Sequence, residues 1–140
     1  MPTTMPAAMT IERADWHSNL IWRMEVFGAR AAGRWEQGQR LQRARPGVQY
    51  YFRYLTAGDH RVRESHAEWH GVILPVDNPW WLTHWPPNGF NCRCEPQIVS
   101  GRDLVRYGWV VTKDDDPRLA IAPDEGFSGN AGAVWEQLRR

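Results

Sequence analysis

The sequence predicts an α+β fold in which an N-terminal helical segment packs on a small, irregular, mostly antiparallel sheet with long ordered loops. A long proline-free segment with helical spacing of apolar residues comes first. Short runs rich in aromatic and β-branched residues follow, as is typical of strands. A loop rich in proline and tryptophan separates two of these runs, and neither a long helix nor a central strand accommodates so many prolines.

The length and composition limit the class of protein. The chain has 140 residues, the size of one domain, with 42% hydrophobic and 24% charged residues, which excludes a wholly disordered chain. We expect residues 1–10 to be a flexible leader and residues 11–140 to form a single domain. No apolar run approaches the roughly 20 residues of a membrane-spanning helix, and the leader lacks the pattern of a secretory signal. We therefore expect no membrane partner.

The first predicted element is a helical segment over residues 11–45. Its apolar residues recur in steps of three or four, which predicts one stripe that faces a core; they are Leu20, Met24, Phe27, Ala31 and Trp35. Three glycines interrupt the segment, at Gly28, Gly33 and Gly38. Because glycine is a poor helix former that permits close approach, they predict a break or a close packing contact.

Arginines gather on this segment and just after it. The net charge is only +1, but nine arginines stand against three acidic residues between Arg23 and Arg63. A solvent-exposed face is the simpler interpretation, and a face that contacts DNA phosphates without sequence preference is the alternative. On that alternative the contacts come from Arg30, Arg34, Arg40 and Arg43.

The middle of the chain predicts two strands around a short ordered element. Val48–Leu55 is rich in aromatic residues and predicts a strand. Asp59–Trp69 lacks glycine and proline and predicts a short helix or an ordered turn. Gly71–Val76 predicts a short strand that ends at Pro75. The proline-rich stretch Asp77–Asn91 predicts an irregular loop, held by tryptophans, that serves as a docking surface.

The last third predicts shorter elements. Cys92–Val99 returns to an extended conformation, and Ser100–Tyr107 is a short helix with Ser100 as its N-cap. Trp109–Thr112 is predicted to be the last strand. Ala131–Leu138 is predicted to be a short C-terminal helix.

Two cysteines and two histidines suggest a metal site. A disulfide between Cys92 and Cys94 would be strained, since one residue separates them. On a helix, His66 and His70 would share one face at i and i+4, and the two thiolates would complete a four-ligand site for Zn²⁺, the one cofactor that the sequence suggests. The alternative is a pair of buried thiols beside a hydrogen-bonded histidine.

The same region allows an acid/base pair. Asp59 and His66 could act as catalytic residues of a small hydrolase or nuclease-like enzyme, with Arg61 or Arg63 holding an anion. The structural alternative is that Asp59 forms an ion pair with Arg63 or Arg93 and so holds the loops together. No phosphate-binding glycine loop or serine nucleophile motif is present in the sequence.

Residues 19–132 resemble the phage Mu F-like minor head protein family. The resemblance rests on the pattern D-x-R-x-R-x-x-H, then a glycine, a tryptophan and P-P-x-G-x-x-C-R-C. The residues that carry it are Asp59, Arg61, Arg63, His66, Gly71, Trp81, Pro86, Pro87, Gly89, Cys92, Arg93 and Cys94. We call them the family motif.

The resemblance implies a structural component of a virus particle. Members of this family act in head morphogenesis, DNA packaging or DNA delivery, and their expected partners are phage portal or capsid proteins, with non-specific DNA as a further partner. The expected location is the phage head or the cytoplasm of the host bacterium. A small hydrolase and a zinc-stabilised binding module remain the alternatives.

Overall fold

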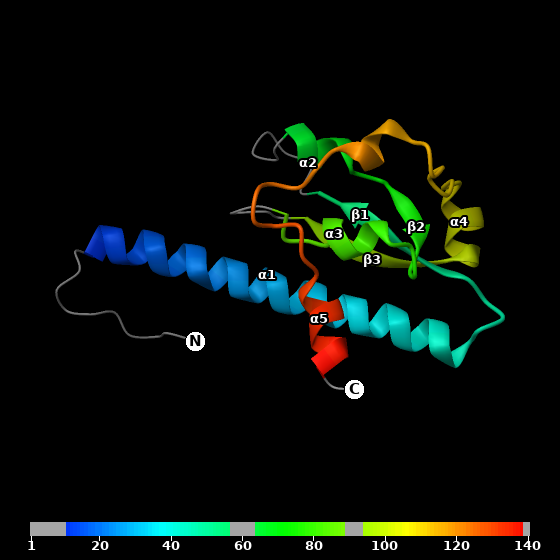
Figure 1. Ribbon diagram of the computed structural model, residues 1–140, viewed down its shortest axis with the longest axis horizontal. Coiled ribbons are helices and arrows are strands. Elements are labelled where there is room, and N and C mark those ends of the chain that lie inside the picture. Colours follow the sequence, from blue (N-terminus) through cyan, green and yellow to red (C-terminus); the bar gives the residue numbers. More distant parts are fainter. Residues whose placement is uncertain (1–10, 57–63, 89–93, 139–140) are drawn as a thin grey trace.

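The computed structural model describes residues 11–56, 64–88 and 94–138. A long helix, α1 (Ile11–Ala44), runs along one side of a small body of strands and short helices, and its N-terminal half extends beyond that body (Figure 1). Helices and one small antiparallel sheet together confirm the predicted α+β class. In the described part of the chain, no helix has the length and apolar character that crossing a membrane requires.

The sheet has three antiparallel strands in the order β2-β1-β3. The central strand β1 (Tyr50–Leu55) pairs with β2 (Ile73–Pro75) on one side and with β3 (Glu95–Ser100) on the other. Alternate residues of β1 are buried, as expected for a strand with one face on a core. The strands predicted within Val48–Leu55 and Gly71–Val76 are thus confirmed.

Helix α1 continues through all three of its glycines, so no break occurs. Its stripe enters the core at Ala31 and Trp35, which are 3% and 6% exposed. Gly38 permits the closest approach, since a Cβ atom there would overlap the ring of Phe52 on β1. The close packing contact is therefore confirmed at Gly38, and it sets how near the helix lies to the sheet.

The stretch predicted to be wholly irregular contains a helix, α3 (Trp80–His84), so that prediction is wrong. Pro79 stands directly before the helix with φ −58°, a helical value, instead of interrupting it. The backbone N–H of Trp80 donates a 2.9 Å hydrogen bond to Asn78 Oδ1, which supports the first turn. Because Pro79 and Pro86 lie outside the five residues of α3, they leave room for one helical turn.

Trp81 and Trp85 of this stretch belong to the core and hold the stretch in place, as predicted, while its role as a docking surface stays a prediction. Trp81 and Trp85 are 0% and 1% exposed, and both rings contact Phe52 edge to face. The indole N–H of Trp85 donates to Ala31 O at 2.8 Å, and that of Trp81 donates to Pro75 O at 3.1 Å. Buried indoles need such partners. The loop is thus fastened to α1 and β2 from the inside.

The segment Trp109–Thr112, predicted to be a strand, does not extend the sheet. Thr112 exchanges hydrogen bonds with Ile73, from Thr112 N to Ile73 O at 2.8 Å and from Ile73 N to Thr112 Oγ1 at 3.0 Å. Because the second acceptor is a side chain, the pairing does not continue as a ladder. Trp109 instead lies under the guanidinium of Arg53, 4.2 Å from its ring centroid.

The remaining elements are short. Helix α4 (Gly101–Tyr107) has the predicted N-cap at Ser100, here a full capping box with Asp103. Helix α5 (Ala131–Leu138) has the predicted bounds, and it crosses the C-terminal half of α1 (Figure 1). The other two helices are α2 (Glu64–Glu68) and the 3-10 helix η1 (Pro117–Ala120).

Candidate functional site

Two residues of the family motif, His66 and Cys94, meet at one end of the sheet. Strand β1 ends at Leu55 and β3 begins at Glu95, and these two residues face each other across the ladder. His66 on α2 and Cys94, just before β3, lie beside this end, with His66 Nδ1 4.0 Å from Cys94 Sγ. The fold thus brings together two residues that are far apart in sequence.

His66 is held in a closed environment. Its side chain is 1% exposed, and its ring stacks on Trp69 with centroids 5.1 Å apart. Asp124 Oδ1 lies 3.4 Å from His66 Nε2, although that nitrogen makes no hydrogen bond to the described residues. The backbone N–H of Asp124 donates to Asn88 O at 3.1 Å, which fixes the acidic residue next to the motif.

The thiol of Cys94, the imidazole of His66 and the carboxylate of Asp124 therefore lie next to one another in that order. Such an arrangement can hold a metal ion through sulfur and nitrogen while the carboxylate orients the ring, or it can pass a proton between its members. Sequence reasoning missed Asp124. The available signal was its position just before the glycine-rich segment Gly126–Gly132, which falls within the resemblance.

The four predicted zinc ligands are not all brought together. Helix α2 ends at Glu68, so His70 does not share a helical face with His66, and the predicted i and i+4 geometry is wrong. His70 Nδ1 instead accepts a 3.1 Å hydrogen bond from the backbone N–H of Thr56. Burial lowers the pKa of His70, and the charge of Arg53 lowers it further.

Cys92 lies outside the described residues, as do five other members of the motif, Asp59, Arg61, Arg63, Gly89 and Arg93. Among the residues that the structure describes, no three His, Cys, Asp or Glu side chains could hold one metal ion. Cys94 beside a buried histidine agrees with the simpler of the two interpretations of the cysteines. The zinc site and the Asp59–His66 pair stay predictions.

Two further motif residues hold the backbone of the site. Gly71 has φ +83°, a value that favours glycine, and its N–H donates a 2.8 Å hydrogen bond to Tyr54 O. This turn leads the chain from α2 into β2. Trp81 lies in the core described above, and so it positions α3 and does not face a ligand.

The proline pair leads directly into a buried polar residue. Asn88 follows Pro86 and Pro87 and is 0% exposed. Its Nδ2 donates to Tyr54 Oη at 2.8 Å and to His84 O at 2.9 Å. The side chain thus ties the proline segment to the central strand and to α3, a role that sequence reasoning did not assign to it.

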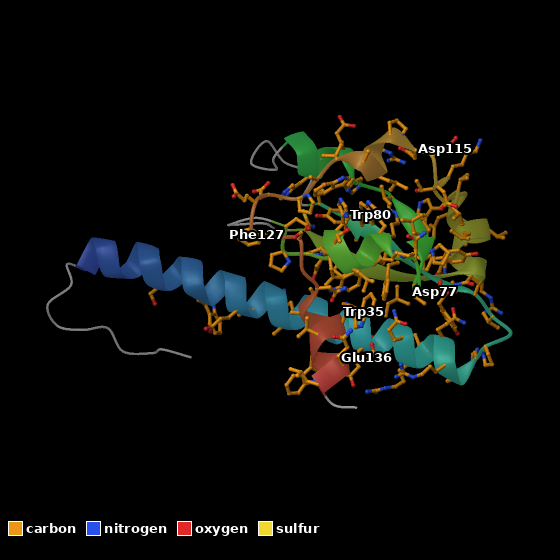
Figure 2. The ribbon with its side chains drawn as sticks, in the orientation of Figure 1. Trp35, Asp77, Trp80, Asp115, Phe127 and Glu136 are labelled. Atoms are coloured by element: carbon orange, nitrogen blue, oxygen red, sulfur yellow. The ribbon has the colours of Figure 1, made fainter. Side chains whose placement is uncertain are left out.

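The arginine face of α1 carries both signs of charge. All four predicted DNA contacts are exposed, at Arg30, Arg34, Arg40 and Arg43. Arg40 forms a 3.0 Å ion pair with Glu36, and Arg43 forms one of the same length with Glu136 on α5. Glu136 also accepts a 3.1 Å hydrogen bond from the indole N–H of Trp35, and the two lie side by side in Figure 2. Part of this face therefore fastens α5 to α1.

Comparison with known proteins places these features in one family. Residues 5–96 match the family described as Phage Mu protein F like protein. The putative capsid assembly protein F of Escherichia phage Mu is 28% identical over 142 residues, which cover 81% of this chain. The Mu-like prophage FluMu F protein of Haemophilus influenzae is 37% identical over 67 residues, which cover 48% of this chain. No solved structure matches.

The relatives are much longer proteins, since the aligned regions span 31% of the phage Mu protein and 16% of the FluMu protein. The family match nevertheless covers well over half of the 140 residues and includes His66, Asn88 and Cys94. The chain belongs to the Phage Mu protein F like family.

Proposed function

We propose that this protein acts in phage head morphogenesis as a structural component that binds portal or capsid proteins. The observation that carries the proposal is the match to a putative capsid assembly protein over 81% of the chain. Three residues of the motif region, Gly71, Trp81 and Asn88, hold the fold, which favours a structural role for these residues over contact with a ligand.

Helix α1 supports a binding role by its length. It has 34 residues, and its N-terminal half lies beyond the body of the domain (Figure 1). Helices in proteins gain most of their stability from packing of one face against other elements. An extended half-helix is therefore a suitable element for contact with another head protein.

The experiment that tests this function is deletion and complementation in the phage or prophage that encodes the chain. Without the gene, we expect electron microscopy to show few complete heads, and a copy of the gene to restore them. We also expect mass spectrometry to find the protein in purified heads. Normal head numbers without the gene, together with absence of the protein from heads, would contradict the proposal.

DNA packaging or delivery would add contacts between α1 and DNA. Four exposed arginines of α1 supply positive charge for phosphates, at Arg30, Arg34, Arg40 and Arg43. We expect weak, salt-dependent binding that each of two double charge reversals reduces, Arg30→Glu with Arg34→Glu and Arg40→Glu with Arg43→Glu. Fluorescence anisotropy with a duplex of random sequence at two salt concentrations measures both effects, and equal affinities for all variants would exclude DNA contact by this face.

A zinc-stabilised module is the second candidate, since His66 Nδ1 and Cys94 Sγ are 4.0 Å apart. Thiolate and imidazole are preferred zinc ligands, and Asp124 is placed to orient the ring. Metal analysis of protein purified without an affinity tag decides the matter. One zinc per chain that is lost in Cys94→Ser would establish the site, and a metal-free protein whose melting temperature does not change with chelator would exclude it.

A further inference from the structure

Helix α5 has apolar residues on two opposite sides. On the inner side Gly132 is buried against α1, where a Cβ atom would lie 2.7 Å from Trp35 Cβ. On the outer side Val134, Trp135 and Leu138 are 54%, 55% and 74% exposed. A large apolar face of a helix normally packs against another element. The described residues leave this outer face of α5 uncovered.

The outer side of α5 forms one wall of an open groove of about 450 Å³. The opposite wall comes from Pro86, Pro87 and Phe127, and the side chain of Phe127 lies on the connection that leads down to α5 (Figure 2). All residues that line this groove are uncharged. We call it the α5 groove.

We propose that the α5 groove docks the apolar face of an amphipathic helix that belongs to another head protein. The inference rests on the proposed function, which supplies the kind of partner. It adds the surface that makes the contact and the chemistry of the segment that is bound.

The lining of the groove selects this occupant over others. Because the lining is uncharged, it offers no ion pair to nucleic acid or to a charged peptide. Pro86 and Pro87 have no backbone N–H, so that wall cannot receive an added strand. Val134 and Leu138 stand at i and i+4, the spacing of a ridge that fits between the ridges of a second helix, and Trp135 stands at i and i+3 with Leu138.

The size of the groove also favours one helix over a second copy of the chain. Pockets of roughly 300–1,000 Å³ hold one small ligand or a few side chains. A stable dimer needs about 800 Å² from each partner, while a large side chain covers only about 150–250 Å². The three exposed side chains of α5 therefore provide the centre of an interface with one segment, and they are too few for a dimer.

The test uses the full chain and the portal and capsid proteins of the phage or prophage that encodes it, titrated one at a time by calorimetry. Val134→Glu and Leu138→Glu place a charge in the groove, and Val105→Glu on α4 is the matched control at an 85% exposed valine. We expect the groove variants to lose at least tenfold in affinity for one of these proteins. The control variant should bind as the natural chain does, and all three should keep their melting temperature.

The outcomes separate the surface from the function. Binding that survives Leu138→Glu but is lost in Val105→Glu would overturn the proposal that the α5 groove is the docking site. The proposed function in head morphogenesis would still stand. If the natural chain binds none of the head proteins, the proposed function fails and the docking proposal fails with it. Hydrogen exchange on the complex should protect a helical partner segment, and protection of a non-helical segment would also overturn the proposal.

Two further measurements exclude occupants from the chain itself. Sedimentation of the natural chain and of Leu138→Glu tests a second copy, and a dimer that dissociates only in the variant would overturn the proposal. Deletion of residues 2–10 tests the uncharged leader. A tenfold gain in affinity on deletion would mean that the leader fills the groove.

Discussion

Two apolar regions of this protein, the tryptophan cluster under the sheet and the outer side of α5, have similar composition and opposite environments. Trp81 and Trp85 are 0% and 1% exposed, and the N–H of each donates to a backbone carbonyl. Trp135 on α5 is 55% exposed. The difference teaches that each buried indole here has an acceptor on another element for its N–H, a backbone carbonyl for Trp81 and Trp85 and the Glu136 carboxylate for Trp35. The first region stabilises the domain, and the second remains available for binding.

The strongest test of this comparison exchanges one tryptophan in each region. We expect Trp85→Ala to lower the free energy of unfolding by about 3–5 kcal/mol, since it empties a core site and leaves Ala31 O without that donor. Trp135→Ala should change it by less than about 0.5 kcal/mol, as for other surface positions. Urea denaturation followed by circular dichroism measures both, and equal losses would refute the contrast.

A second test concerns how closely α1 approaches the core. Gly38→Ala should cost about 1–3 kcal/mol, because its methyl group would overlap the buried ring of Phe52. Gly33→Ala on the same helix is the matched control, since nothing lies within 4 Å of a Cβ atom there. The control should stabilise the protein by up to about 1 kcal/mol through its better helix propensity. Stabilisation by both variants would show that α1 is not pressed against Phe52.

The buried amide of the motif provides a third test. Asn88→Ala should cost about 1–3 kcal/mol, because Tyr54 Oη and His84 O lose a buried donor. Gln137→Ala, at an exposed position on α5, should change stability by less than about 0.5 kcal/mol. An unchanged melting temperature for Asn88→Ala would mean that water replaces the amide.

The smallest expected effect is a dependence of stability on pH. Burial lowers the pKa of His84, although its hydrogen bond to Ile121 O opposes the shift. The unfolded chain therefore takes up the proton more readily, so stability is greatest above about pH 6.5, the ordinary histidine pKa, and falls as the pH drops below it. Denaturation between pH 7.5 and 5 should show this loss.

His84→Gln should flatten the dependence, and His70→Gln should flatten it less, since the pKa of His70 is also lowered but its ring is exposed. A slope that persists in full in the His84 variant would assign the effect to other groups. Asp116 is not among them in this range, because its pKa is lowered from an already acidic value by Arg118.

Local signals predicted several elements well. The N-cap at Ser100, the bounds of α5 and the strands β1 and β2 follow from capping residues, helical propensity and aromatic runs, which act over a few neighbouring residues. The errors at α3 and at Trp109–Thr112 have different causes. The first turn of α3 is supported by Asn78 Oδ1, only two residues away, so the signal was local and the surrounding prolines outweighed it in the prediction. Whether Trp109–Thr112 joins the sheet depends on a partner far along the chain, since Thr112 bonds to Ile73.

The candidate site shows the same division. The motif marked His66 and Cys94 as belonging together, and the structure confirms that they are neighbours. It could not identify Asp124 or the role of Asn88, since both act through contacts across the fold. The sequence alone determined the family, the α+β class and the helices at both ends, because those depend on residue order and spacing. Only the tertiary structure decided which tryptophans are core and which face of α5 is left to bind, because burial depends on what the rest of the chain places against each side chain.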